Sequence, residues 1–329
     1  MKLFLWNTNL ATRSVISQIL SSYDSCIILT DQKSIKDMAD LIELPHTIVI
    51  YLESVYNIIT VFRAKSIVKN LFRNNHIDHI YMYHQGYGDF YNWIIRYAHC
   101  QDIPITYKRV LSKVKGEPCY CLRSIFLRLK FWCLYRVNYD VIKRDDSYGF
   151  QFLLSKHFFK KNKIVEEQAF INSDSLDIIG EKIFGKLNLK IQPNSIILLT
   201  GGLSDVGYVT REVHEKKSAE LINRLGNNRI ICKKHPRFDD ESKAEKELPH
   251  IPSFISMELL MHFFNCFIGY SSSVLLNTSK EGICSISLID YYGCSNEHER
   301  KFLKQYLSDA EVFYPQNLEQ LENTIYEAK

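Results

Sequence analysis

The sequence predicts an α/β protein with two Rossmann-like domains. Short apolar runs alternate with segments of helical length along all 329 residues. This alternation is typical of βαβ units, in which helices cover both faces of a parallel sheet. A polar stretch with Gly and Pro, Phe184–Asn194, interrupts the alternation and is the best linker. We therefore expect an N-terminal domain over residues 1–188 and a C-terminal domain over residues 189–329.

Each half contains apolar runs of strand length separated by longer segments of helical length. In the first half we expect strands at Lys2–Trp6, Cys26–Leu29, Thr47–Tyr51, His79–Tyr83, Ile105–Tyr107 and Tyr139–Ile142, with helices at Thr12–Ser22, Val55–Asn74 and Asp89–Cys100. In the second half we expect strands at Ser195–Thr200, Arg229–Cys232, Cys266–Tyr270 and Ser285–Ile289, with helices at Thr210–Leu225, Val274–Glu281, His298–Leu307 and Leu318–Glu327. Ligands of open parallel sheets bind beyond the carboxyl ends of the strands, so the functional residues are expected there.

Composition and charge exclude several classes of protein. Hydrophobic residues make up 46% and charged residues 24%, as in ordinary globular proteins. No apolar run reaches the roughly 18 residues of a membrane-spanning helix, and the apolar start is too short for a signal peptide. The nine cysteines include no CxxC pair, so neither a disulfide framework nor a zinc ribbon is indicated. The net charge of +4 is too small to predict a nucleic-acid partner. We expect a reduced, cytoplasmic protein.

The segment Leu122–Arg136 combines basic residues with large apolar and aromatic ones. It has two interpretations. In the first, it is a core helix whose basic side chains extend along apolar surface to reach water. In the second, it rests on an anionic membrane surface, where basic and aromatic residues act together. The second interpretation would make the protein peripheral to the inner face of the cytoplasmic membrane.

Three segments of the second half follow expected strands and could bind a phosphate. Gly201 and Gly202 follow the first strand, where the absence of a Cβ lets backbone amides approach a ligand; a tight turn would explain them equally well. Lys234, His235 and Pro236 follow the second strand, and cations next to a histidine suit a phosphate or carboxylate. The proline biases His235 toward an extended conformation.

The third segment is the run of serines Ser271, Ser272 and Ser273 after Gly269. A single serine there would be an ordinary helix N-cap, but three beside a helix N-terminus suggest an anion site. Together the three segments predict a nucleotide-phosphate site in the C-terminal domain. There is no GxGxxG fingerprint after a strand, no Walker A motif, no Asp-x-Asp and no His/Cys cluster at ligand spacing. We therefore expect no metal and no cofactor.

The order Lys-Lys-His235-Pro236, then Glu258, then the serine run resembles the motifs of bacterial sialyltransferases. More broadly it is similar to bacterial transferases that use CMP-activated nonulosonic acids, including the lipooligosaccharide sialyltransferase and polysialyltransferase-like families. The resemblance covers about residues 140–290. It implies a GT-B fold, in which two Rossmann-like domains face a central cleft and the C-terminal one holds most of the donor. It also implies that His235 and the serines contact the CMP phosphate, that Glu258 accepts hydrogen bonds from the ribose, and that Gly201 and Gly202 form a donor loop.

The catalytic base of that family lies in an acidic-acidic-Gly motif after a strand of the first domain. The matching residues here are Asp145 and Asp146, but Ser147 stands at the glycine position and Gly149 comes two residues later. We favour Asp146 as the base and keep Asp145 as the second choice. Two adjacent acids in a polar loop are otherwise mostly a solvated turn. Asn7, His84 and Gln85 also follow expected strands and are weaker candidates for acceptor contacts.

The resemblance implies an inverting, metal-independent transfer of sialic acid from CMP-sialic acid to a sugar hydroxyl. The acceptor would be galactose in a bacterial surface glycan or glycolipid, such as an O-antigen, lipooligosaccharide or capsule. Three alternatives remain open. The donor could carry another acid, such as Kdo, legionaminic or pseudaminic acid. The chain could be a UDP-sugar transferase or epimerase on the same scaffold. It could also be a non-catalytic module that binds a nucleotide or a glycan.

Overall fold

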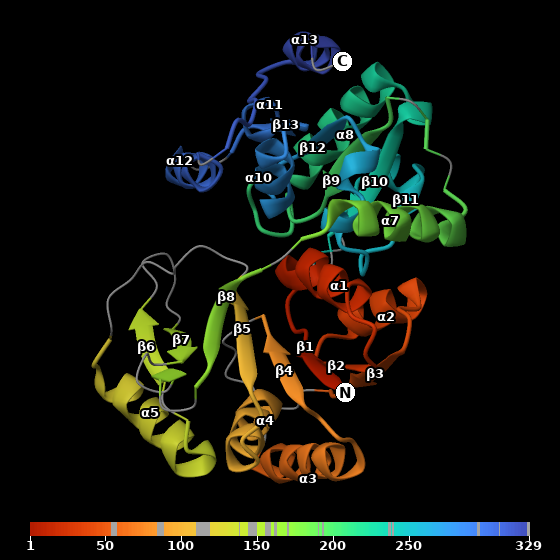
Figure 1. The fold of residues 1–329 in the computed structure, drawn as a ribbon. Helices are drawn as coiled ribbons and strands as arrows, with labels where there is room; N and C mark the ends of the chain where they lie inside the picture. The colour runs from red at the N-terminus through yellow and green to blue at the C-terminus, as the bar shows by residue number, and fades with distance from the viewer. Residues whose placement is uncertain are drawn as a thin grey trace. The chain divides into compact units, whose positions relative to one another are not determined.

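The chain divides into two compact units, Met1–Leu176 and Asp177–Lys329 (Figure 1). The computed structural model describes residues 1–53, 58–83, 89–109, 119–137, 139–143, 150–154, 159–160, 163–169, 171–189, 191–192, 194–235, 238, 240–294, 297–308 and 310–327. The division lies inside helix α7 (Ser173–Leu187), ahead of the boundary expected after residue 188. Phe184, the first residue of the expected linker, is buried in this helix and packs against Phe263 at 5.1 Å between ring centroids.

Unit 1 contains a parallel six-stranded sheet with the order β3-β2-β1-β4-β5-β8. Its strands are β1 (Lys2–Leu5), β2 (Cys26–Thr30), β3 (Thr47–Tyr51), β4 (His79–Met82), β5 (Ile105–Arg109) and β8 (Val165–Gln168). Its helices are η1 (Asn9–Ala11), α1 (Thr12–Leu20), α2 (Lys33–Ile42), α3 (Ile58–Asn74), α4 (Asp89–Cys100) and α5 (Leu122–Tyr135). The strand order reverses between β1 and β4, so the carboxyl ends of these two strands form a switch point.

The strand expected at Tyr139–Ile142 exists but does not belong to this parallel sheet. It is β6 (Tyr139–Lys143), which pairs antiparallel with β7 (Phe150–Leu154) in a separate two-stranded sheet. Tyr139 is held against helix α4, because its hydroxyl donates a 2.6 Å hydrogen bond to Asn92 Oδ1. The edge of the parallel sheet is instead β8, which the hydrophobic pattern did not reveal because all four of its residues are exposed.

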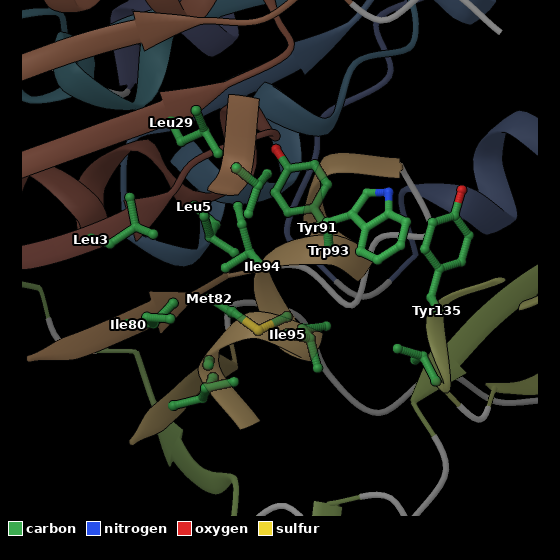
Figure 2. Packing of buried hydrophobic residues seen from close by; sticks show 14 of the residues in the cluster. Leu3, Leu5, Leu29, Ile80, Met82, Tyr91, Trp93, Ile94, Ile95 and Tyr135 are labelled. Carbon is green, nitrogen blue, oxygen red and sulfur yellow. The ribbon is translucent and has the colours of Figure 1, made fainter. Parts of the chain in front are cut away.

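The core of unit 1 joins the sheet to helices α4 and α5 through apolar and aromatic packing. Figure 2 shows part of this cluster, with side chains from β1, β2 and β4 beside those of α4. On the α5 side, the ring of Tyr135 packs edge-on against the ring of Trp93, with 5.3 Å between the ring centroids. The ring centroids of Phe131 and Tyr139 are 5.0 Å apart. These contacts hold one face of α5 to the body of the unit.

Unit 2 repeats the same topology with a parallel five-stranded sheet, in the order β11-β10-β9-β12-β13. Its strands are β9 (Ile196–Thr200), β10 (Ile230–Lys234), β11 (His250–Ile251), β12 (Cys266–Gly269) and β13 (Cys284–Ser287). Its other elements are α8 (Arg211–Leu225), η2 (Asn227–Arg229), α9 (Lys243–Lys246), η3 (Met257–Leu259), η4 (Met261–Phe263), α10 (Ser273–Lys280), α11 (Ile289–Tyr292), α12 (Glu297–Tyr306) and α13 (Leu318–Glu327).

Both units therefore have a doubly wound sheet, which confirms the predicted fold class of two Rossmann-like domains. In unit 2 the order reverses between β9 and β12. Of the helices in the described part of the chain, none is both long enough and apolar enough to cross a membrane.

Candidate functional site

The three segments predicted to bind a phosphate follow three neighbouring strands of unit 2. In the parallel register, Thr200 at the end of β9 is level with Lys234 at the end of β10. Leu199 of β9 is level with Gly269, the last residue of β12. Because parallel strands end at the same edge of a sheet, the residues after β9, β10 and β12 emerge side by side. The edge includes the β9/β12 switch point, where ligands of such sheets bind.

The loop after β9 runs so close to the loop after β10 that a side chain does not fit between them. Gly201 has φ of +109°, and a Cβ built on it would lie 2.7 Å from His235 Cβ. Gly202 has φ of +82°, and its Cβ would lie 3.0 Å from the ring of Phe238. The rings of His235 and Phe238 are 4.7 Å apart. Gly201 is thus required by its conformation and by the close approach of His235, and Gly202 by its conformation and by the ring of Phe238.

The serine run forms the N-terminus of helix α10. Ser272 is the N-cap, and its hydroxyl accepts a 3.2 Å hydrogen bond from the backbone N–H of Val274. Ser271 precedes the cap, Ser273 is the first helical residue, and all three serines are half-buried. A helix N-terminus at the carboxyl edge of a sheet presents backbone N–H groups and a positive dipole end to an anion.

Glu258 is attached to the same helix. It lies in η3, and Asn277 of α10 donates a 3.3 Å hydrogen bond from Nδ2 to Glu258 Oε1. The Ser256 hydroxyl donates to the other carboxylate oxygen. Both oxygens therefore already have protein partners, which fixes the orientation of this half-buried carboxylate.

The two lysines before His235 have different environments. Lys234 Nζ lies 3.5 Å from Glu241 Oε2, so its charge is paired within the unit. Lys233 is buried, and its ammonium donates 3.0 Å hydrogen bonds to the backbone oxygens of Lys234 and Ser253. Burial lowers the pKa of Lys233 to about 8. Pro236 lies outside the described residues.

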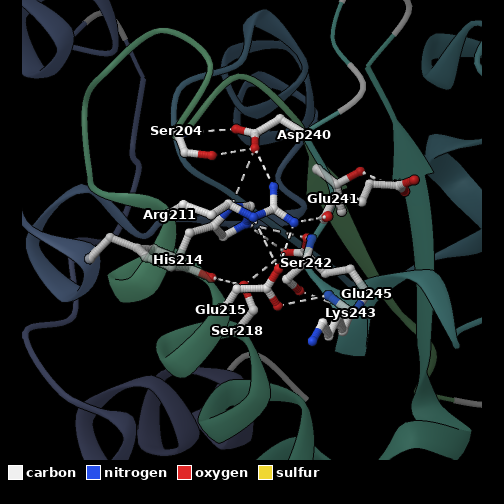
Figure 3. Close-up of polar contacts among 12 residues, drawn as sticks. Ser204, Arg211, His214, Glu215, Ser218, Asp240, Glu241, Ser242, Lys243 and Glu245 are labelled. Carbon is white, nitrogen blue, oxygen red and sulfur yellow. Dashed lines mark hydrogen bonds and ion pairs between the residues drawn. The ribbon is translucent and has the colours of Figure 1, made fainter.

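A buried polar network joins the segment after β9 and the start of α8 to residues 240–245 (Figure 3). At its centre, the fully buried Asp240 accepts hydrogen bonds from the backbone N–H groups of Ser204 at 2.6 Å and Asp205 at 3.1 Å. Arg211, at the start of α8, donates to the same carboxylate at 2.8 Å and to the Glu241 backbone oxygen at 2.7 Å. Burial acts to raise the pKa of Asp240, but hydrogen bonds from Ser204 and Asp205 outweigh it and hold the pKa below its ordinary value.

A second carboxylate ties the network to the sheet. Glu241 Oε1 accepts a 3.3 Å hydrogen bond from the Thr200 hydroxyl and lies 2.8 Å from His250 Nε2. Thr200 is the last residue of β9, so the network reaches the start of the glycine loop. We did not predict Asp240 or Glu241 from the sequence, although the run of three acids at positions 239–241, shortly after His235, was a signal that could have revealed them.

The carboxyl edge of the unit 1 sheet contains buried polar atoms without partners. Asn7 Oδ1 after β1 and Asp31 Oδ1 after β2 are buried, and neither atom has a hydrogen-bond partner within 3.5 Å among the described residues. These two strands are neighbours in the sheet. Buried polar atoms without partners are costly, so these two atoms are candidates for contact with a polar ligand. Of the acceptor candidates, only Asn7 is described here, and it is one of these groups.

Asp31 is a carboxylate at this edge that the sequence reading missed. It directly follows β2 and is half-buried, and burial raises the pKa of its carboxyl group. Burial, next the charge of Asp31 and then a hydrogen bond with Asp31 raise the pKa of Tyr91 well above its usual value. Functional residues of parallel sheets often follow the carboxyl ends of strands, and Asp31 follows the expected strand Cys26–Leu29 closely. Its position in the sequence was therefore a signal that could have identified it.

The predicted bases Asp145 and Asp146 and the acceptor candidates His84 and Gln85 lie outside the described residues. The acidic pair was expected after a strand of the parallel sheet. The preceding strand, β6, instead belongs to the antiparallel pair, because Tyr139 to Lys143 hydrogen-bond with β7. Within the described ranges, no three His, Cys, Asp or Glu side chains lie together so that they could hold a metal ion.

No family model matches the chain, and a search of curated proteins finds no relative. Solved structures do resemble it. A UDP-GlcNAc 2-epimerase from Methanocaldococcus jannaschii is 14% identical, with 99% of this chain and 92% of that chain covered and a TM-score of 0.53. A Photobacterium 2,6-sialyltransferase, solved in complex with CMP and lactose, is 13% identical, with 95% and 78% covered and a TM-score of 0.53. A sialyltransferase from Photobacterium damsela is 11% identical, with 95% and 81% covered and a TM-score of 0.52.

The chain has a GT-B-type fold. At these identities the likeness shows the fold alone. The enzymes that share it use nucleotide-sugar chemistry, but they include both transferases and epimerases. The function must therefore be argued from the residues of this chain.

Proposed function

We propose that the chain is a nucleotide-sugar enzyme whose unit 2 binds the nucleotide phosphate at the carboxyl edge of β9, β10 and β12. One observation carries this proposal: Gly201 approaches His235 so closely that it excludes a side chain, beside a helix N-terminus that carries three serines. Backbone N–H groups, hydroxyls and an imidazole at a switch point suit a phosphate. In the proposed complex His235 and Ser271–Ser273 contact the phosphate, and Glu258 accepts hydrogen bonds from the ribose.

We propose further that the reaction is sialyl transfer from CMP-sialic acid to a sugar hydroxyl, with galactose in a bacterial surface glycan as the acceptor. A carboxylate removes the proton of the acceptor hydroxyl as its oxygen attacks the anomeric carbon. The bond from that carbon to the CMP phosphate oxygen breaks in the same step, which inverts the configuration. His235 and the serines stabilise the charge that develops on the departing phosphate. The proposed mechanism uses no metal.

A further candidate for the catalytic base comes from unit 1. Asp146, with Asp145 as second choice, is proposed by resemblance. Asp31 is a third candidate, because it stands beside β1 at the carboxyl edge of unit 1 and burial raises the pKa of its carboxyl group. A raised pKa suits a carboxylate that must take a proton near neutral pH.

The second candidate function is epimerisation of a UDP-sugar. The observation that favours it is the Methanocaldococcus jannaschii epimerase structure, which superposes on this chain as well as a sialyltransferase does, with a TM-score of 0.53 in both cases. A transfer of Kdo, legionaminic or pseudaminic acid from its CMP donor would use the same phosphate site. A module that binds without turnover is the remaining alternative. For the transferase, we propose a cytoplasmic location at the inner face of the membrane on which the glycan grows.

The deciding experiment measures CMP release from CMP-sialic acid, with and without a galactose-terminated acceptor, in the presence of EDTA. Acceptor-dependent release supports the donor class and metal independence. The variants Asp146→Ala, Asp145→Ala and Asp31→Asn are compared in parallel, and loss of turnover with CMP binding retained identifies the base. If all three variants keep full activity, the proposed base catalysis is wrong. UDP binding with UDP-GlcNAc epimerisation, and no CMP release, would establish the second candidate instead.

A further inference from the structure

Helix α5 exposes a continuous apolar stripe to solvent. Five large apolar side chains lie on it at helical spacing, and their exposed fractions are 87% for Leu122, 43% for Ile125, 67% for Phe126, 56% for Leu129 and 47% for Trp132. The intervals of three, four, seven and ten residues from the first to the others place all five on one face of the helix. A stripe of this size on one helix is unusual for a protein surface and indicates an interaction site.

The opposite face of α5 is already packed, so the stripe is not an unfinished part of the core. Ser124, Phe131 and Tyr135 are buried on that face. Arg96 also donates a 3.0 Å hydrogen bond to the Leu134 backbone oxygen, which adds a polar attachment to the aromatic contacts of Phe131 and Tyr135. The structure therefore corrects the interpretation of this segment as a core helix with basic residues reaching out to water: most of the apolar residues themselves face outward.

Basic residues accompany the stripe, and the sequence of this segment contains no acidic residue. Four cations lie in this stretch, and no Asp or Glu occurs between Glu117 and Asp140. At 3.6 residues per turn, Arg123 and Lys130 project on one side of the stripe, and both are exposed. At the C-terminal end of the helix, the guanidinium of the C-cap residue Arg136 lies 4.5 Å from the centroid of the Trp132 ring. An apolar stripe accompanied by cations complements an anionic lipid surface, in which acyl chains lie beneath negative headgroups.

We propose that α5 is a membrane-docking helix that lies in the interface of an anionic leaflet, with the stripe inserted among the lipids. At 14 residues, α5 is about 21 Å long, which suits a helix lying in the membrane plane. The helix is held by its buried face while the opposite face enters the lipid, so docking requires no unfolding of unit 1. This inference does not depend on the reaction proposed above, since it uses only the surface of α5.

The test is flotation of the purified full chain with vesicles of phosphatidylcholine alone and of phosphatidylcholine with phosphatidylglycerol. We expect binding to the anionic vesicles that weakens with salt. Phe126→Glu should abolish it, whereas the matched control Phe62→Glu should not, because Phe62 is an equally exposed phenylalanine (68%) on helix α3 of the same unit. Arg123→Gln and Lys130→Gln each remove one exposed cation, and each should weaken binding to the anionic vesicles about fivefold. Both phenylalanines are exposed, and circular dichroism verifies that the variants fold.

Three outcomes would overturn the proposal. The wild type could fail to float with anionic vesicles. The variants Phe126→Glu and Phe62→Glu could float equally well, which would place the contact elsewhere. The chain could instead form a dimer in analytical ultracentrifugation that Phe126→Glu dissociates, without any vesicle binding; the stripe would then be a protein interface. A blue shift of tryptophan fluorescence with anionic vesicles that Trp132→Phe removes would support the docking geometry, since Trp6 and Trp93 are buried.

Discussion

Adding a single methyl group at Gly201 should disrupt the proposed phosphate site through His235. The Gly201→Ala Cβ would lie 2.7 Å from His235 Cβ, whereas two carbon atoms in contact are separated by about 3.5–4.0 Å. The His235 side chain would have to move by about 1 Å. The same substitution also places a non-glycine residue at φ of +109°, which is unfavourable by itself. The loss of unfolding free energy should therefore have two components, one from the backbone conformation and one from the steric contact with His235.

Gly207→Ala is the matched control, because it isolates the conformational component. Gly207 lies in the same loop with φ of +81°, and a Cβ there would meet nothing within 4 Å. We expect Gly207→Ala to cost about 1–2 kcal/mol of unfolding free energy. Gly201→Ala should cost about 1–3 kcal/mol more, because it overpacks the contact with His235.

Two assays separate the outcomes. Urea denaturation measures the unfolding free energies, and calorimetric titration with CMP measures nucleotide binding. Gly201→Ala should weaken CMP binding at least tenfold, which corresponds to about 1.4 kcal/mol, while Gly207→Ala should leave the affinity unchanged. Equal unfolding free energies and equal CMP affinities for the two variants would refute the reasoning.

Three further predictions concern buried charges. Burial raises the pKa of Asp31, so the folded chain holds that proton more tightly than the unfolded chain, and stability should fall as pH rises through the raised pKa. Asp31→Asn should remove this fall in a pH series of denaturation curves, and an unchanged series would contradict it. Asp240→Ala should lower the unfolding free energy by about 3 kcal/mol, because the buried groups that donate to Asp240 lose their acceptor. The control Glu322→Ala, which removes an exposed ion pair with Arg224, should lower it by less than about 1 kcal/mol. Equal losses in urea would show that Asp240 does not organise the loops. Burial lowers the pKa of Lys233 from 10.5 to about 8. Between pH 8 and 10.5 the Lys233 amine is therefore protonated in the unfolded chain and mostly neutral in the folded chain. The stability of the wild type relative to Lys233→Met should therefore rise by up to about 3 kcal/mol from pH 8 to 10.5, and a constant difference would be contradictory.

The parallel sheets could be predicted from the sequence because their central strands are short, buried and strongly apolar. Cys26–Thr30 is buried throughout, and Ile196–Thr200 nearly so, and such runs differ clearly from the surrounding helices. The edge strand Val165–Gln168 could not be found in this way, because none of its four residues is buried. The sheet membership of Tyr139–Lys143 depends on its pairing with β7, and pairing is not encoded in the apolar pattern of one strand.

The candidate site could be predicted in part. His235, the glycines and the serines were found because they directly follow strands that are easy to recognise. Asp240 was missed because its role depends on partners distant in the sequence, Ser204 and Arg211, which only the folded loops bring to it. The exposure of α5 was likewise not predictable, because the helix is apolar on two opposite faces and the sequence does not show which face is covered.

The most direct test of the central claim is calorimetric titration of CMP into the wild type and into His235→Ala. The proposed site predicts that CMP binds the wild type and that the variant, folded by circular dichroism, binds at least tenfold more weakly. UDP is titrated in parallel to distinguish the transferase from the epimerase candidate. If neither nucleotide binds the wild type, or if His235→Ala binds as tightly as the wild type, the edge of β9, β10 and β12 is not the nucleotide-phosphate site.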